Sequence, residues 1–230
     1  MDMNRLMVDQ SMAQAQEVLD ELGLEIAPGG IVTIGDLQKA DRGYVHHSSM
    51  PVAVVGYALV SRSLAAGRFP KIRLLDVVAK RPAMDAGEAI AMARLCGVEL
   101  QPPFWGNAQP FADHLFDVLD RYEMQAFFQR LDEPLRSEQP HYAVRPTAVD
   151  WRQDEVIPEA MTAWRKAYKA LPAARQMMVA TVMWLYRGGE DKTWLSRVPW
   201  QWPAADAISV LHAAGCLADW ARLVALYPGW

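Results

Sequence analysis

The chain ends in a tryptophan-rich stretch, Ala173–Trp230, which reads AARQMMVATVMWLYRGGEDKTWLSRVPWQWPAADAISVLHAAGCLADWARLVALYPGW. It indicates one helix that ends before Gly188, a tryptophan-rich loop, and two short helices separated at Gly215. A packed tryptophan buries roughly 150–250 Å², so we expect this stretch to supply much of the apolar surface of the core. Six of the nine tryptophans lie in it: Trp184, Trp194, Trp200, Trp202, Trp220 and Trp230.

Proline and glycine mark the ends of successive segments throughout the chain. Proline suits the first turn of a helix, where its missing N–H is not needed, and glycine suits the residue after the last turn. The pattern predicts a mostly α fold with little or no sheet. The segments that follow it are 51–67, 71–80, 84–96, 110–131, 159–170, 172–187 and 203–214.

Apolar residues recur at three- and four-residue steps in two of these segments, as expected for helices with one buried face. Short connections between helices predict antiparallel hairpins. The expected architecture is an irregular array of antiparallel helical hairpins, either solenoid-like or an orthogonal bundle. The stripes consist of Phe111, Leu115, Val118, Leu119, Tyr122 and Ala126, and of Met161, Trp164, Tyr168 and Leu171.

One short run permits two interpretations. Residues 31–34 are rich in β-branched side chains, which favour a strand. Thr33 and Asp36 also have the spacing of a capping box at the start of a helix. We favour the helix start, and the strand is the alternative.

A proline-containing segment, 132–157, has few apolar residues and is predicted to be a loop or linker. It separates an N-terminal helical part, 1–131, from a C-terminal tryptophan-rich helical part, 158–230. A helical part as small as the second usually needs a neighbour to complete its core. We therefore expect the two parts to pack as one continuous body.

Composition bounds the class of protein. The chain has 230 residues, of which 52% are hydrophobic and 22% charged, and its formal net charge is −4. These values are typical of a soluble globular protein and disfavour a dedicated nucleic-acid binder. No apolar run approaches the roughly 20 residues of a membrane span, and the start of the chain does not resemble a signal peptide. The expected location is cytoplasmic, with Cys96 and Cys216 as buried free thiols.

The strongest candidate site is a basic stretch from Arg62 to Arg81, in which Asp76 is the single acid. Clustered cations bind acidic surfaces or phosphates, and partly exposed tryptophans are typical of protein interfaces. A solvated outer face of two helices would show the same charge pattern. The candidate partner-binding residues are Arg62, Arg68, Lys71, Arg73, Trp200 and Trp202.

A second candidate site contains His46 and His47 with Asp41 nearby. Imidazole and carboxylate groups ligate metals and transfer protons. Adjacent residues of an extended chain point to opposite faces, so a metal site would need further ligands from elsewhere. Polar loop histidines are the simpler interpretation.

The chain has no phosphate-binding loop, no GxGxxG or GxSxG motif and no catalytic Cys–His signature. It therefore indicates no cofactor and no intrinsic catalysis. We predict a helical module that binds another protein, as an adaptor, a cognate inhibitor or a chaperone-like partner, and homo-oligomers remain open. The alternatives are a metal-binding protein or hydrolase-type enzyme that uses His46 and His47, and a weak nucleic-acid or phosphate binder that uses Arg62–Arg81.

Overall fold

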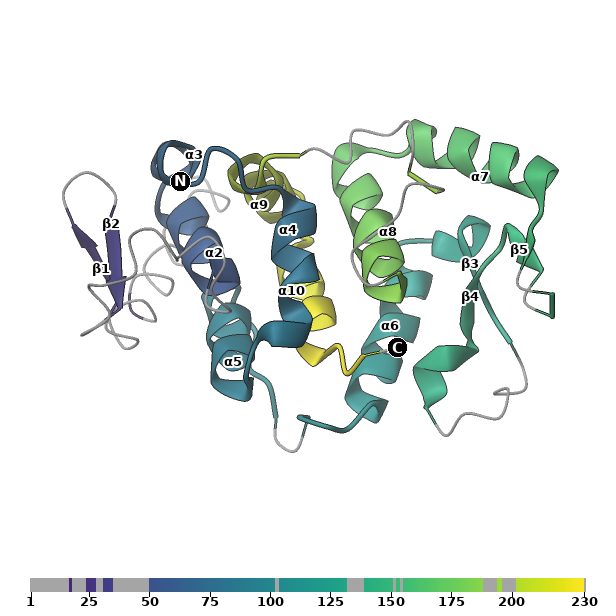
Figure 1. Cartoon of the computed structure of the whole chain (residues 1–230), viewed down its shortest axis with the longest axis horizontal. Coiled ribbons are helices and arrows are strands. Elements are labelled where there is room, and N and C mark those ends of the chain that lie inside the picture. Colours follow the sequence, from purple (N-terminus) through teal and green to yellow (C-terminus); the bar gives the residue numbers. More distant parts are fainter. Residues whose placement is uncertain are drawn as a thin grey trace, which may run out of the picture. The chain divides into compact units, whose positions relative to one another are not determined.

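The protein is described by a computed structural model, which is mostly helical as the sequence predicts (Figure 1). None of the helices within the described ranges is long and apolar enough to cross a membrane. The ranges that the structure describes are 17, 24–27, 31–34, 50–101, 104–131, 139–150, 152–153, 155–187, 194–195 and 202–229.

In this part of the chain, β structure consists of three antiparallel pairs of short strands and one isolated bridge. The predicted helix start at Thr33 is wrong, because the β-branched run pairs with an earlier strand and Leu24 lies opposite Ile34. The strands are β1 (Leu24–Ala27) with β2 (Ile31–Ile34), β3 (Phe128–Arg130) with β4 (Val144–Pro146), and β5 (Val149–Asp150) with β6 (Glu155–Val156).

The chain divides into two compact units. The first contains residues 1–101 and 201–225, and the second contains residues 102–200 and 226–230. This division differs from the predicted boundary at 132–157, since part of the tryptophan-rich C-terminal stretch returns to the first unit. The packing of the two parts as one continuous body remains a prediction.

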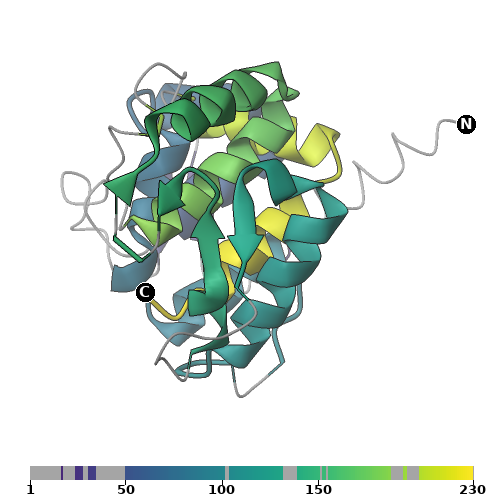
Figure 2. The same ribbon diagram turned by 90° about the vertical axis from the view of Figure 1, so that its right-hand side faces the viewer.

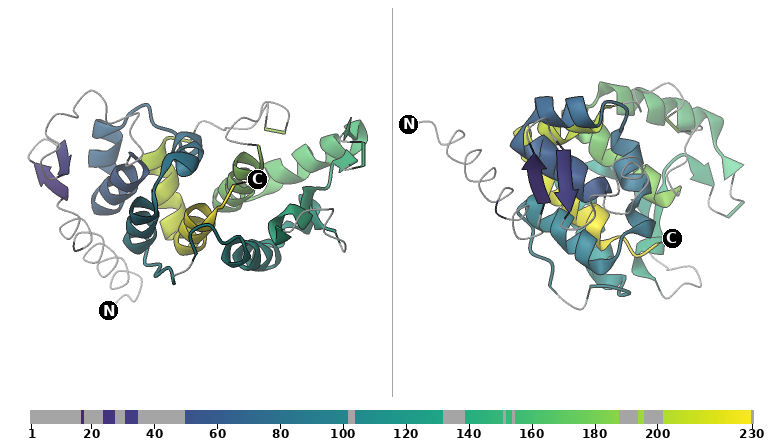
Figure 3. Two further views of the ribbon diagram at one scale, coloured as in Figure 1. Left: turned by 60° about the horizontal axis from the view of Figure 1, so that its bottom comes forward. Right: turned by 60° about the vertical axis from the view of Figure 1, so that its left-hand side comes forward.

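The first unit is built around α2 (Met50–Val60), in which every residue from Met50 to Leu59 is buried. A helix that is apolar on all sides must be covered on all sides. Its neighbours are α3 (Arg62–Arg68), α4 (Leu74–Ala79), α5 (Ala86–Leu95) and α9 (Ala204–Ala213). The same packing is seen from two other directions in Figure 3.

Helix ends in the first unit follow the local sequence. Asp85 caps α5 in a capping box with Glu88, whose backbone N–H donates to the Asp85 carboxylate over 2.8 Å. Gly97 after α5 and Gly215 after α9 have φ of 76° and 71°, which glycine adopts without strain. The last described helix, α10 (Leu217–Leu226), begins two residues after Gly215 and buries Trp220 completely.

The second unit begins with α6 (Gln109–Arg121), whose predicted apolar stripe is buried as far as Leu119. The predicted continuation to Leu131 is wrong. The chain turns at Glu123, which has a left-handed φ of 52°, and continues through the 3-10 turn η3 (Met124–Ala126) into β3. Figure 2 turns this unit toward the viewer and shows β3 beside β4.

Part of the predicted linker is built into the second unit. Residues 140–143 form the 3-10 turn η4 (Pro140–Ala143), which leads into β4, and His141 and Val144 are buried. The described remainder contributes β5 and β6. Segment 139–150 therefore contributes buried residues and short strands to the second unit.

An aromatic cluster of the second unit is centred on α7 (Pro158–Ala170), and the hydroxyl of Tyr168 donates to the Gln176 carbonyl of α8 (Ala173–Tyr186) over 3.0 Å. The rings of Trp164 and Tyr168 stack with centroids 5.4 Å apart, and Phe127 and Trp194 pack edge-on against Trp164. The indole N–H of Trp164 donates to the Phe127 carbonyl over 3.1 Å. Trp194 is therefore a core residue and not part of an exposed surface.

Candidate protein-interaction surface

The segment before α4 and the segment before α9 pair through their backbones. The N–H of Leu74 donates to the Trp202 carbonyl over 3.0 Å, and the N–H of Ala204 donates to the Ile72 carbonyl over 2.8 Å. Arg73 and Pro203 form an isolated antiparallel bridge between these bonds. The pairing brings the backbone segments 72–74 and 202–204 side by side, although they are far apart in the sequence.

Arg73 is held mainly by its neighbour Asp76. Its Nη2 and Nε lie 2.6 and 2.9 Å from the two carboxylate oxygens, and its backbone N–H donates to the same carboxylate over 2.8 Å. The hydrogen bond to Asp76 raises the pKa of Arg73 above its ordinary value. A two-bond ion pair at the first turn of α4 stabilises that helix end, so much of the charge of Arg73 is balanced within the fold.

Arg62 joins α3 to the first turn of α9. Its Nε lies 2.6 Å from Oδ1 of Asp206, and the side chains are 64% and 39% exposed. A pair this exposed is screened by water and contributes about 0–1 kcal/mol. The guanidinium thus stays accessible to a partner while it marks where α3 and α9 meet.

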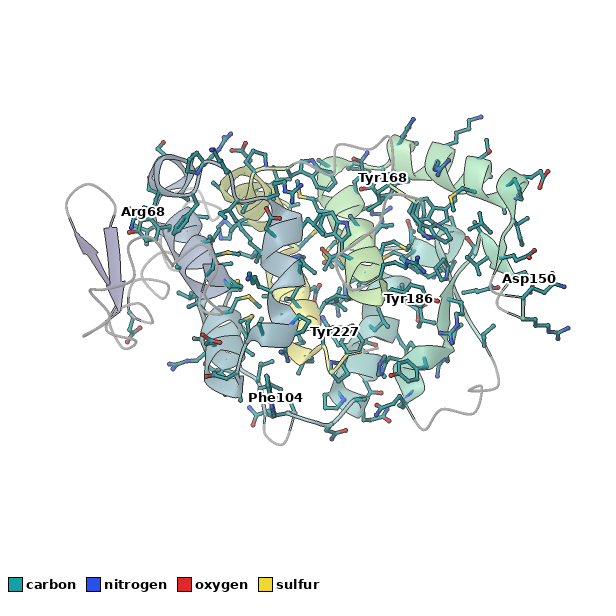
Figure 4. All side chains as sticks on the ribbon, in the orientation of Figure 1. Arg68, Phe104, Asp150, Tyr168, Tyr186 and Tyr227 are labelled. Atoms are coloured by element: carbon teal, nitrogen blue, oxygen red, sulfur yellow. The ribbon has the colours of Figure 1, made fainter. Side chains whose placement is uncertain are left out.

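Arg68 and Lys71 complete the cationic part of this region. Arg68 is the last residue of α3 and is half-buried (labelled in Figure 4), whereas Lys71 lies exposed between α3 and α4. Trp202 is half-buried. We call the set Arg62, Arg68, Lys71, Arg73 and Trp202 the basic surface.

The structure thus brings five of the predicted partner-binding residues into the first unit, on segments that contact one another. Trp200 lies outside the described residues. The sequence analysis did not identify Asp206, which pairs with Arg62. Its position in the first turn of α9, where acidic residues are favoured, was the signal that could have identified it.

Arg81 does not belong to the basic surface, which corrects the predicted basic stretch. It is buried, and its Nε and Nη2 donate to the carbonyls of Val224 and Ala225 over 3.0 and 2.9 Å. These carbonyls end α10, where the helix dipole is negative. Arg81 is therefore a cap for α10 and is not available to a phosphate.

The predicted metal site cannot be placed, because Asp41, His46 and His47 lie outside the described residues. Within the described ranges, no group of three or more His, Cys, Asp or Glu side chains could hold a metal ion. The site remains a prediction, which elemental analysis of the purified protein tests directly. Both cysteines are free and buried, as predicted.

Comparison with known proteins adds no assignment: no protein-family model, curated protein or solved structure matches the chain.

Proposed function

We propose that the chain is a helical protein-interaction module whose basic surface binds an acidic segment of another protein. The observation that carries the proposal is the backbone pairing of residues 72–74 with 202–204. It brings the backbone of Trp202 to the segment that contains Arg73, and this supports a surface that combines an aromatic side chain with cations.

The composition of the basic surface suits a protein partner. Tryptophan and arginine are the residues that most often dominate binding energy at protein interfaces. Exposed charges such as Lys71 speed association and select partners of opposite charge. Trp202 is half-buried, so its ring can contact a partner while its backbone stays bonded to Leu74.

Two aspartates distinguish this surface from a phosphate-binding one. Asp76 forms an ion pair with Arg73, and Asp206 forms one with Arg62. Their carboxylates would repel any phosphate bound at these arginines. Nucleic-acid binding depends on a high density of unbalanced cations. A protein segment that presents a few carboxylates and apolar groups fits the mixed charge better.

The test is affinity capture from native extract with four forms of the full chain: wild type, Lys71→Glu, Trp202→Ala and Lys169→Glu. Lys169 is the matched control, since it is an exposed lysine on α7 in the second unit. Captured proteins are identified and quantified by mass spectrometry. Circular dichroism and thermal melts confirm that each variant is folded.

We expect wild type and Lys169→Glu to retain the same protein, and retention to fall about tenfold or more in Trp202→Ala and Lys71→Glu. Retention should also weaken as salt is added, because screening reduces the attraction. Equal retention of the protein by wild type, Lys71→Glu and Trp202→Ala would contradict the proposal, and so would the absence of any retained protein.

A further inference from the structure

The last described residues of the chain bind within the second unit, which contains residues 226–230. Tyr227 (labelled in Figure 4) is buried, and its hydroxyl donates to the Leu185 carbonyl of α8 over 2.9 Å. Its ring packs edge-on against Phe111 of α6 with centroids 5.5 Å apart. We call residues 226–229 the C-terminal strap.

His141 on η4 holds the other end of the strap. It is 0% exposed, and its Nε2 lies 2.9 Å from the Gly229 carbonyl oxygen. A carbonyl can only accept, so Nε2 carries the hydrogen. The imidazole also packs edge-on against Phe111, with centroids 5.3 Å apart. One phenylalanine ring therefore contacts both residues that hold the strap.

Charge on this imidazole is costly. Burial lowers the pKa of His141, and the hydrogen bond to the Gly229 carbonyl opposes that shift to a smaller extent. The titratable side chains of the segments packed here are Tyr142 beside the ring, buried His114 on α6 and Tyr227 on the strap. The aspartates of α6 are exposed: Asp113, Asp117 and Asp120.

We propose that the C-terminal strap is an acid-sensitive latch, which protonation of His141 releases from the second unit. The neutral ring is compatible with burial beneath the strap. The imidazolium is stabilised when the strap leaves and water reaches the ring.

The sign of the effect follows from the two states. With the strap released, the pKa of His141 returns toward its ordinary value of about 6.5, whereas with the strap bound it is lower. At a pH above the pKa of the released state, the ring is neutral in both states, and pH does not change the ratio of released to bound strap. Between the two values, each pH unit of acidification increases the ratio of released to bound strap by up to about tenfold. At a pH below the pKa of the bound state, the ring is protonated in both states, and the ratio of released to bound strap is again constant.

Nuclear magnetic resonance on the isotope-labelled full chain tests the latch. The heteronuclear NOE of the Gly229 amide reports motion of the strap, and the ring resonances of His141 report its protonation. Both are followed from about pH 7.5 to about pH 5, across the ordinary pKa of histidine. We expect Gly229 to be rigid at the upper limit and mobile at the lower, with one midpoint for both signals.

Two variants separate the latch from general acid loosening. His141→Gln keeps a neutral donor for the Gly229 carbonyl, so its strap should stay bound throughout. Tyr227→Phe loses the bond to Leu185, so its strap should be looser at every pH and should be released at a higher pH than in wild type. Release of Gly229 at the wild-type midpoint in His141→Gln would overturn the proposal. A strap that stays rigid in wild type after His141 has titrated would also overturn it, whether or not the variants fold.

Discussion

The guanidinium of Arg81 is buried against the end of α10, where it donates to the carbonyls of Val224 and Ala225. Arg81→Met keeps the aliphatic stem but removes this donor from two buried carbonyls. We expect the free energy of unfolding to fall by about 2–4 kcal/mol. Arg222→Met, at an exposed position on the same helix, should change it by less than about 0.5 kcal/mol.

Chemical denaturation of both variants measures this difference. Equal effects at Arg81 and Arg222 would show that the cap contributes nothing to stability.

Cys96 is a second residue whose chemistry follows from burial. Desolvation raises the pKa of its thiol strongly, so almost no thiolate forms near neutral pH. Because the thiolate is the nucleophile, we expect iodoacetamide to modify Cys96 at least about a hundredfold more slowly in the native protein than in denaturant. Peptide mass spectrometry distinguishes Cys96 from Cys216. Comparable rates in the two states would contradict the packing of α5.

At the scale of elements, α6 ends because the backbone turns at Glu123. Its φ of 52° costs a residue with a side chain about 1 kcal/mol or more, and glycine pays no such penalty. The ion pair of Glu123 with Arg175 spans 3.1 Å and is exposed, so it offsets little of this cost. Glu123→Gly and Glu123→Ala both remove the ion pair and differ in backbone freedom.

We therefore expect Glu123→Gly to be more stable than Glu123→Ala by about 1 kcal/mol in denaturant titrations. The same pair of substitutions at Gln125, where φ is not positive, should favour alanine. A Glu123→Ala variant as stable as Glu123→Gly would show that the turn is unstrained.

Local sequence was sufficient to predict where most helices begin. Proline at position 158 begins α7, proline at 172 precedes α8, and glycine at 97 and 215 follows α5 and α9. These signals are short-range, since each depends on one residue and its own turn. The end of α6 was missed because glutamate has no left-handed preference that would mark position 123. The strand β2 was only the alternative interpretation, because its stability comes from the paired strand.

At the scale of the whole molecule, the assignment of α9 and α10 to the first unit could not be predicted. Apolar periodicity shows that a helix has a buried face but not which helix covers it. The structure packs α9 against α2, and the Leu74 N–H donates to the Trp202 carbonyl just before α9 begins. The charge pattern of the sequence predicted four residues of the basic surface, and the loop context predicted Trp202. The sequence did not show that the segments carrying them contact one another, because those contacts depend on the fold.

Site-specific photo-crosslinking tests the basic surface most directly. A benzoylphenylalanine is introduced at position 71, which is exposed between α3 and α4. In a second protein it is introduced at position 169 on α7, and both proteins are irradiated in native extract. The account predicts one discrete crosslinked protein from position 71 and none of that species from position 169. The same species from both positions, or no crosslink from position 71, would contradict binding at the basic surface.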